Sequence, residues 1–180
     1  MHFSFTLDVE DWMEFQKHFL LTSRMFKRTR IMLTWLLPLV ILFLFFKDFD
    51  ASQLSASYAA PYIVMAAVAF AWMIFFPNFY FNRVLSQARK LAERGEHNDI
   101  LGDRELTVDA NDGITQKFGG EVFEVTWNDI VRIDQTENYY YLFNTKMSAV
   151  IVPVLKIRSN PDQGKLIKLL NERKQTLETA

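Results

Sequence analysis

Two long stretches without a charged side chain constrain this sequence more than any other feature. The first is Ile31–Phe46, which as a helix would be about 24 Å long at about 1.5 Å per residue. Snorkelling by Arg30 and Lys47 can extend it towards the roughly 30 Å hydrocarbon core of a bilayer. The second, Tyr58–Phe81, is long enough to cross with some tilt. The sequence therefore predicts a hairpin of two transmembrane helices over residues 31–82.

A pair of buried helices in a soluble domain is the alternative interpretation of these two stretches. Such helices would need a large partner surface, because the run Leu36–Phe46 is apolar on every side. We therefore favour the membrane. Pro77, near the end of the second stretch, indicates a kink or the end of the embedded part.

The basic residues flanking the two stretches predict the orientation of the hairpin. The connecting loop Lys47–Ser57 carries one Lys against Asp48 and Asp50. Four basic residues precede the first stretch and four follow the second: Arg24, Lys27, Arg28, Arg30, Arg83, Arg89, Lys90 and Arg94. Loops rich in Lys and Arg remain in the cytoplasm. Both termini are therefore expected in the cytoplasm, with the chain in a cytoplasmic (inner) membrane.

Residues 1–30 read as a strand followed by an amphipathic helix. His2–Leu7 alternates apolar and polar side chains, which is typical of a half-buried strand, and we expect it to pair with an edge of the C-terminal sheet. Asp8 and Asp11 have the spacing of a helix cap. The apolar side of the helix is formed by Val9, Trp12, Met13, Phe15, Phe19 and Leu20, and this helix is expected to run into the first span.

The acidic residues at the start of that helix have two interpretations. A general acid/base or cation site is one, and helix capping is the other. Carboxylates are favoured in a first helical turn by the helix dipole, so capping is the preferred interpretation for the group Asp8, Glu10, Asp11 and Glu14.

Residues 83–180 predict a linker helix over 83–94, with a stop at Gly95, and then a strand-rich domain. Gly119 and Gly120 form a two-residue hairpin signal. The expected strands are Glu105–Asp109, Ile114–Phe118, Glu121–Thr126, Ile130–Gln135, Tyr139–Asn144 and Ala149–Pro153. A final helix is expected to be capped by Ser159 or Asn160. Such an order predicts a partly open barrel or a curled antiparallel sheet closed by the helix.

The order of these segments resembles the YcxB-like family of bacterial membrane proteins. The resemblance is carried by FTLDVEDWMEF near the N-terminus, the two central apolar stretches, the glycine hairpins, and the later segments TWNDIVRI, NYYYLF and VIVP. It implies a membrane α+β fold whose C-terminal domain is a pleckstrin-homology-like (PH-like) curled sheet capped by a C-terminal helix. It implies no biochemical activity. The chain departs from the family after Pro153, where Val154 and Leu155 replace a basic residue and an aromatic one.

Catalytic, cofactor and metal signatures are missing from the sequence. It has no cysteine, and its three histidines, His2, His18 and His97, are far apart. No pair has the spacing of zinc ligands. The G-x-S-x-G nucleophile motif is also missing. The glycine pair Gly119–Gly120 lies between two strand patterns, so a hairpin turn is preferred there over a phosphate-binding loop. We therefore predict a protein that is not an enzyme and that carries no cofactor or metal.

An aromatic run provides the candidate partner surface. Tyr139, Tyr141 and Phe143 are expected on one face of a strand, and Tyr140 on the other. One face belongs to the core, and the other meets a protein partner, the lipid interface, or the chain's own N-terminal strand and helix. Trp127 completes the candidate surface, although a core anchor is the preferred interpretation for this residue.

The predicted function is a non-enzymatic, membrane-tethered module that binds a protein partner or a second copy. The alternative is a membrane immunity or regulatory protein whose spans contact a toxin, transporter or channel. Nucleic acid is not expected, because the basic flanks lack interleaved aromatics. A phosphoinositide-type head group is not expected either. The loop Asp109–Gly113 is acidic, and Gly95–Ala180 holds 10 Lys and Arg against 14 Asp and Glu.

Overall fold

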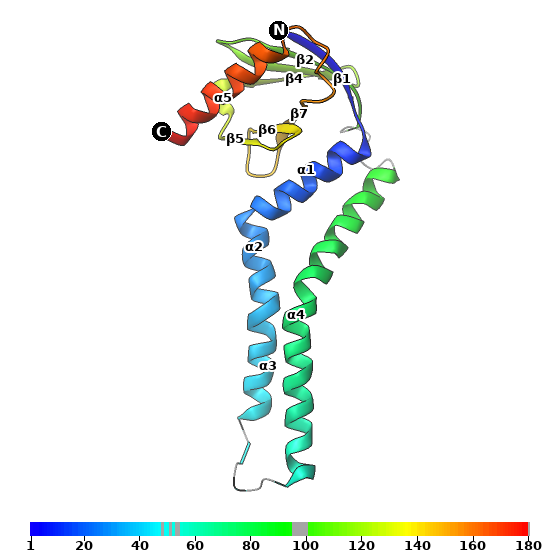
Figure 1. The fold of residues 1–180 in the computed structure, drawn as a ribbon, viewed down its shortest axis with the longest axis vertical. Helices are drawn as coiled ribbons and strands as arrows, with labels where there is room; N and C mark the ends of the chain where they lie inside the picture. The colour runs from blue at the N-terminus through cyan, green and yellow to red at the C-terminus, as the bar shows by residue number, and fades with distance from the viewer. Residues whose placement is uncertain (48, 51, 53–54, 95–100, 180) are drawn as a thin grey trace. The chain divides into compact units, whose positions relative to one another are not determined.

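The computed structural model describes residues 1–47, 49–50, 52, 55–94 and 101–179, which form two compact units. Unit 1 comprises Met1–Gln16 and Arg89–Ala180, and unit 2 comprises Lys17–Ala88. All seven described strands belong to unit 1, and unit 2 is helical (Figure 1).

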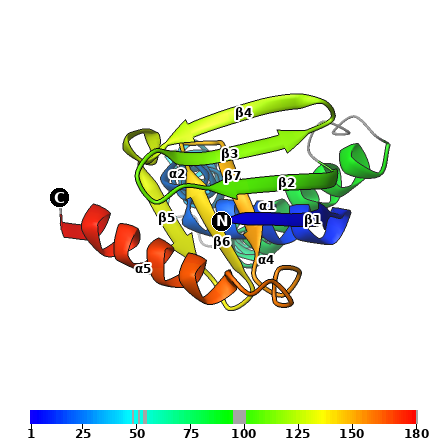
Figure 2. The ribbon, with the colours of Figure 1, turned by 90° about the horizontal axis from the view of Figure 1, so that it is seen from above.

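A four-stranded antiparallel sheet joins the N-terminal strand to the C-terminal part of the chain. Its strands are β1 (His2–Leu7), β2 (Gly102–Val108), β3 (Gly113–Phe118) and β4 (Glu121–Thr126), in that order across the sheet. Figure 2 shows β1 beside β2. His2 pairs with Thr107 and Leu7 with Gly102, which confirms the predicted pairing of the N-terminal strand.

A second sheet of three strands follows, made of β5 (Arg132–Gln135), β6 (Tyr139–Phe143) and β7 (Ala149–Pro153). The turn η3 (Trp127–Asp129) separates it from β4. There Thr126 and Asp129 cap each other reciprocally, which ends β4 and turns the chain away from the first sheet. An α+β fold is confirmed, but the strands form two sheets rather than one curled sheet.

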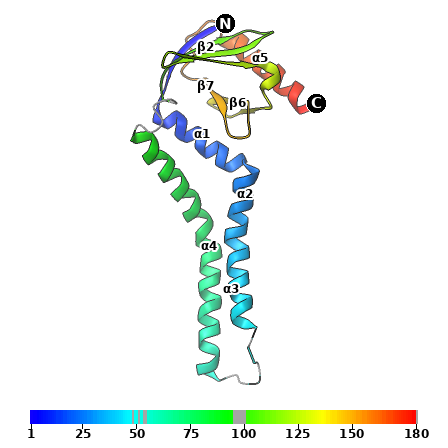
Figure 3. The same ribbon diagram turned by 180° about the vertical axis from the view of Figure 1, so that it is seen from behind.

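The C-terminal helix α5 (Gln163–Thr179) begins later than its capping signals predicted. The side chain of Asn160 accepts a hydrogen bond from the N–H of Asp162, which forms a turn before the helix. The first helical bond then runs from Leu166 to the carbonyl of Asp162. Figure 3 shows α5 beside the strands of unit 1.

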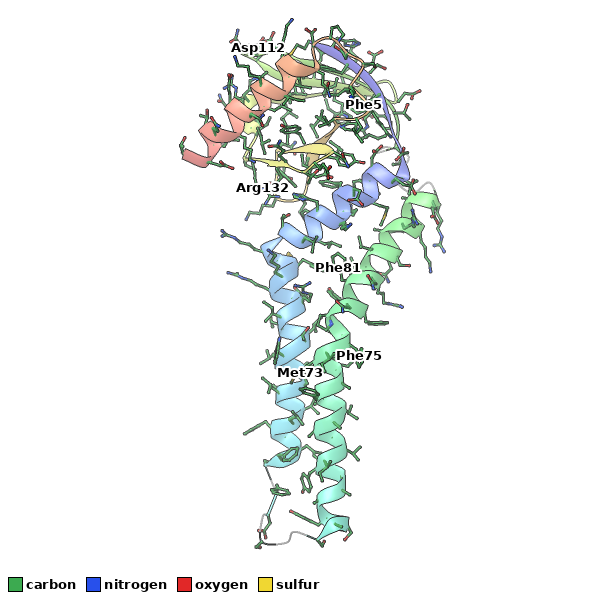
Figure 4. All side chains as sticks on the ribbon, viewed as in Figure 1. Phe5, Met73, Phe75, Phe81, Asp112 and Arg132 are labelled. Carbon is green, nitrogen blue, oxygen red and sulfur yellow. The ribbon has the colours of Figure 1, made fainter. Side chains whose placement is uncertain are left out.

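The core of unit 1 follows from the alternation of its strands. On β1 the apolar residues at every second position are buried, and Phe5, labelled in Figure 4, is one of them; β2 adds Leu106 and Val108 and β3 adds Ile114. The most deeply buried residues of this core are Phe3, Leu106, Val108, Ile130, Tyr141, Leu142, Phe143, Val152, Pro153, Leu166 and Leu170. The N-terminal strand thus shares one core with segments more than 100 residues away.

The first helical segment of unit 2 contains α2 (Arg24–Ile31), the π-helical turn η1 (Met32–Leu36) and α3 (Leu37–Phe46). The preceding helix α1 (Val9–Thr22) does not run into it, contrary to expectation. Ser23 has an extended backbone and caps α2 by accepting a hydrogen bond from the N–H of Phe26, which interrupts the helix.

The second helical segment is one helix, α4 (Ala56–Glu93), which unites the expected second span with the expected linker helix 83–94. Pro77 therefore does not end the helix. In a long helix the carbonyl groups that a proline leaves free can be satisfied by local adjustment. The predicted stop at Gly95 lies outside the described residues.

A side-chain hydrogen bond joins the two helical segments. Trp72 Nε1 donates to the carbonyl oxygen of Leu33 at 3.1 Å. In a helix that carbonyl would accept from residue 37 or 38, but the N–H of Leu37 donates to Met32 and Pro38 has no N–H. The indole thus satisfies an acceptor that the π-helical turn and the proline leave free.

Large apolar side chains on both helical segments are uncovered. Phe75, labelled in Figure 4, is 70% exposed, and Phe43 is 72% exposed. Arg24–Phe46 and Ala56–Glu93 are long and apolar enough to cross a membrane, judged by length and composition. Within the most apolar 18 residues of each segment, only 11% is buried in Arg24–Phe46 and only 6% in Ala56–Glu93.

Candidate functional site

The aromatic strand β6 is covered on one face by α1. The ring centroid of Phe15, on α1, lies 5.5 Å from that of Tyr141 and 6.1 Å from that of Phe143. Arg132, labelled in Figure 4, lies over the Phe143 ring at 4.0 Å. Tyr141 and Phe143 are each 1% exposed, so this face belongs to the interior of unit 1.

The opposite face of β6 is covered by α5. The hydroxyl of Tyr140, which is 2% exposed, donates to the side-chain oxygen of Asn171 at 2.9 Å. Of the alternatives left open by the sequence, the structure favours the one in which the chain covers its own aromatic strand. Tyr140, Tyr141 and Phe143 do not form an exposed surface, and Tyr139 is half-buried.

Trp127, the fifth residue of the candidate surface, is also buried and packs inside unit 1. Its Nε1 donates to the carbonyl of Asp109 at 2.9 Å. The guanidinium of Arg173 lies 5.0 Å from the Trp127 ring centroid and donates to the carbonyl of Ala110 at 2.6 Å. These contacts favour the core anchor, because they tie α5 and the β2–β3 loop to the same indole.

A polar cluster, which we call the Asp11–Lys156 cluster, consists of Asp8, Asp11, Tyr139 and Lys156. Lys156 Nζ lies 2.5 Å from Asp11 Oδ2 and 2.6 Å from Asp8 Oδ2. It also donates to the carbonyl of Thr6 at 3.0 Å. The Tyr139 hydroxyl donates to Asp11 Oδ1 at 2.9 Å. Asp11 is 3% exposed, so its charge is buried together with its partners.

The two aspartates also cap α1, as their spacing predicted. The N–H of Asp11 donates to Asp8 Oδ1 at 3.0 Å, and the N–H of Asp8 donates to Asp11 Oδ2 at 2.9 Å. The capping interpretation is confirmed for this pair. Glu10, by contrast, lies on the surface and pairs with Arg89 at 2.7 Å.

Lys156 is the member of the cluster that sequence reasoning missed. It lies 145 positions after Asp11, in a turn beyond β7, and no periodic pattern connects the two. Val154 and Leu155, where the sequence departs from the family pattern, directly precede Lys156. Only the folding of β1 against the C-terminal part brings this ammonium to the aspartates.

The ionisation of the cluster follows from these contacts. The hydrogen bond from Lys156 lowers the pKa of Asp8, and the N–H of Asp11 adds to that effect. Burial lowers the pKa of Lys156, but its bonds to Asp11 and Asp8 outweigh burial, so that the pKa is raised overall. Burial, followed by the bond to Asp11, raises the pKa of Tyr139. At neutral pH the cluster therefore holds the Lys156 ammonium and the Asp8 carboxylate beside the neutral Tyr139 phenol.

Such an arrangement stabilises structure and provides no nucleophile with an adjacent base. The ammonium of Lys156 supplies the positive charge that a cation would otherwise bring to the two carboxylates. Among the described residues, no group of three or more metal-ligating side chains could hold an ion. The cluster therefore holds the junction of β1 and α1 against the segment that follows β7.

These features define a class of protein: an α+β chain in which an apolar helical pair is inserted between two neighbouring strands, β1 and β2. Residues 110–170 match the model of the family described as YcxB-like protein, which confirms the resemblance seen in the sequence. The match covers β3 to β7 and the first half of α5. No curated protein and no solved structure matches the chain.

Proposed function

We propose that this chain is a non-enzymatic binding or scaffolding module tethered to a bacterial inner membrane. Arg24–Phe46 and the apolar part of Ala56–Glu93 form the transmembrane hairpin, and unit 1 is the binding domain. The observation that carries the proposal is the apolar surface of the two helical segments, which unit 2 leaves uncovered. Lipid is the solvent that such a surface requires.

The pairing of β1 with β2 supports a hairpin of two spans. β1 precedes both helical segments and β2 follows them, yet the strands are paired along their whole length. An even number of crossings returns the chain to the side on which it started, and a single crossing would separate the strands. The basic flanks, which favour the cytoplasm, then support cytoplasmic termini.

Unit 1 is proposed to be a PH-like domain with the hairpin inserted between its first two strands. The support is a four-stranded sheet, a three-stranded sheet and a closing C-terminal helix, in this order along the chain. Counting from β1, the acidic loop Asp109–Gly113 joins the second and third strands rather than the first two. The first two strands are joined by the hairpin itself.

That insertion also supports the proposal that phosphoinositide head groups are not ligands. PH-like folds commonly hold phosphates with basic residues in the loop between their first two strands, and here that loop is replaced by helices. The adjacent β2–β3 loop is acidic, and Asp109 is held ionised by the N–H groups of Asn111 and Asp112, which lower its pKa.

Labelling of single cysteines tests the tether, because the chain contains no cysteine of its own. Ser57→Cys lies in the first turn of α4, next to the connection between the helical segments, and Asn111→Cys lies in the β2–β3 loop; both positions are exposed. In intact spheroplasts, a membrane-impermeant maleimide is expected to label Ser57→Cys and to leave Asn111→Cys unlabelled until the membrane is opened. The opposite pattern would contradict the orientation, and equal labelling would contradict the hairpin.

Exchange of the helices separates the binding module from the alternative in which the spans contact the partner. In a variant whose two spans are replaced by unrelated hydrophobic helices, proteins crosslinked to unit 1 in mildly solubilised membranes are expected to be retained. Loss of those proteins, with the variant still folded and inserted, would favour the immunity or regulatory alternative.

A further inference from the structure

The two edges of the four-stranded sheet differ in how they are covered. At the β1 edge, Asn160 Nδ2 donates to the carbonyl of His2 at 2.8 Å, and Lys156 Nζ donates to the carbonyl of Thr6 at 3.0 Å. Side chains from the segment beyond β7 therefore occupy two backbone acceptors of this edge, those of His2 and Thr6. Covering of this kind prevents an edge strand from pairing with another chain.

At the β4 edge, no described strand pairs with the outer side of Val122–Glu124, and no described side chain bonds to the backbone there. Val122 is 54% exposed and Phe123 is 51% exposed, and they alternate between the two faces of the strand. No proline or lysine lies on β4 to protect it. An edge with apolar side chains on both faces is suited to pairing with a further strand.

The β3–β4 turn shows which backbone groups of β4 point outwards. Gly119 and Gly120, with φ of 57° and 87°, form a two-residue hairpin turn between Phe118 and Glu121. Residues flanking such a turn form a hydrogen-bonded pair, and the pattern then alternates. The N–H and C=O groups of Val122 and Glu124 consequently point away from β3 and are available to a new strand.

We infer that β4 pairs antiparallel with β4 of a second copy of this chain, in a register centred on Phe123. In that register the outward groups of Val122 meet those of Glu124 of the second copy, and reciprocally. Phe123 lies opposite Phe123 of the second copy in a non-hydrogen-bonded pair, where side chains approach most closely. The two four-stranded sheets become one continuous sheet.

The charges of the strand favour this register. Glu124 lies opposite Val122 of the second copy, and Glu121 lies opposite Val125. A register centred on Glu124 would instead place two carboxylates opposite each other, which is destabilising. Lys117, exposed on β3, lies between Glu105 of β2 and Val122 of its own β4, and its flexible side chain is long enough to extend across Val122 towards Glu124 of the second copy. This contact is a charge pair between the two copies.

The dimer gives the proposed binding module a partner and rests on that proposed function. The two fail separately: the labelling of Ser57→Cys and Asn111→Cys reports the tether, whereas a disulfide through β4 reports the pairing of copies.

Disulfide trapping of the full chain in its membrane tests the inference. Phe123→Cys is expected to form a disulfide-linked dimer on mild oxidation, because Cα atoms of a non-hydrogen-bonded pair lie about 4.5 Å apart, within disulfide range. Val131→Cys, at an equally exposed apolar position outside β4, is the matched control. Val122→Cys tests the register, because it faces Glu124 of the second copy, and two such cysteines lie on a diagonal of about 7–8 Å.

The expected order of trapping is Phe123→Cys above Val122→Cys and Val131→Cys. Equal trapping of Phe123→Cys and Val131→Cys would overturn the dimer. The same result is expected if β4 pairs with a peptide of another protein instead of a second copy. Trapping of Val122→Cys as strong as that of Phe123→Cys would overturn the register. Reversal by a reducing agent identifies the linkage as a disulfide.

Charge reversal provides a second readout in the Phe123→Cys background. Glu124→Lys is expected to lower trapping by about twofold to thirtyfold, the fold-change that corresponds to the two equivalent cross-strand pairs of a symmetric dimer. Adding Lys117→Glu and Glu105→Lys is expected to restore it, because Lys117 lies directly opposite Glu105 on β2 and the whole row of charges is then re-formed with exchanged signs. If this triple exchange trapped no better than Glu124→Lys alone, the proposed contact between the copies would be wrong.

Discussion

The two units place their apolar side chains in opposite ways. In unit 1, Phe3, Leu106 and Tyr141 are at most 1% exposed, whereas in unit 2 Phe43 and Phe75 are at least 70% exposed. Unit 1 also buries a charged cluster around Asp11, while the only described residue of unit 2 with a buried polar side chain is Thr34. One chain therefore contains two folding environments: unit 1 excludes water from a core, and unit 2 presents its apolar surface to its surroundings.

The largest expected effect is loss of a core side chain from unit 1. Phe3→Ala is expected to lower the free energy of unfolding by about 3–5 kcal/mol, because it leaves a cavity under β1 that the rigid sheet cannot fill. Chemical unfolding of the full chain in detergent micelles measures the change. Phe75→Ala is the matched control and is expected to change stability by less than about 0.5 kcal/mol. Equal losses for the two variants would break the contrast between the units.

A smaller effect is expected for the Asp11–Lys156 cluster. Lys156→Met leaves the carboxylate of Asp11, whose side chain is 4% exposed, without its counter-charge. We expect a loss of about 2 kcal/mol, below the 3–5 kcal/mol of a fully buried pair because the Lys156 side chain is one-third exposed. Lys165→Met, which breaks a surface pair with Asp162, is expected to cost about 0–1 kcal/mol. Similar values for both would show that the cluster is not a structural anchor.

The same cluster predicts a pH dependence with two limbs. The pKa of Asp8 is lowered from 3.8 in the folded chain, so its contribution is present above pH 3.8 and is lost as the pH falls through the lowered value. The pKa of Lys156 is raised from 10.5, so its contribution is present below pH 10.5 and is lost as the pH rises. Unfolding midpoints measured from acid to alkaline pH should fall less at both ends for Lys156→Met than for the unmodified chain. Parallel curves would contradict this assignment.

The smallest expected effect concerns the contact between the helical segments. Trp72→Phe removes the donor to the Leu33 carbonyl and is expected to weaken the helical pair by about 0.6 kcal/mol, the average for hydrogen bonds between membrane helices. Trp35→Phe, at a 53% exposed indole, is the control and is expected to have no effect. Unfolding of the variants in mixed SDS and mild detergent measures the difference. An equal response of both variants would assign the effect to the loss of an indole rather than to the hydrogen bond.

Local signals in the sequence predicted much of the secondary structure. The strands Glu121–Thr126 and Ala149–Pro153 were predicted with the boundaries that the structure shows, because alternation and the Gly119–Gly120 turn act over a few residues. The capping of α1 by Asp8 and Asp11 is equally local. The break at Ser23 was missed, because a serine within an amphipathic pattern does not by itself indicate that one helix ends and another begins.

The candidate surface could be predicted only in part. Alternation along β6 correctly divided Tyr139, Tyr141 and Phe143 from Tyr140, but it could not show what covers either face. That depends on Phe15 and on Asn171, which come from opposite ends of the chain. The exposed edge at Phe123 was likewise hidden, because the order of strands in a sheet is not a periodic property of sequence.

The sequence by itself determined the elements of this protein: two apolar helical segments, a series of short strands and a C-terminal helix. These depend on periodicity, charge and turn chemistry, which are properties of neighbouring residues. The tertiary structure alone decided that β1 lies beside β2 with the helices inserted between them, and that Lys156 meets Asp11. It also decided that one sheet edge is covered while β4 is open. Contacts of this kind join residues far apart in the chain, and they form only when burial of a shared core brings those residues together.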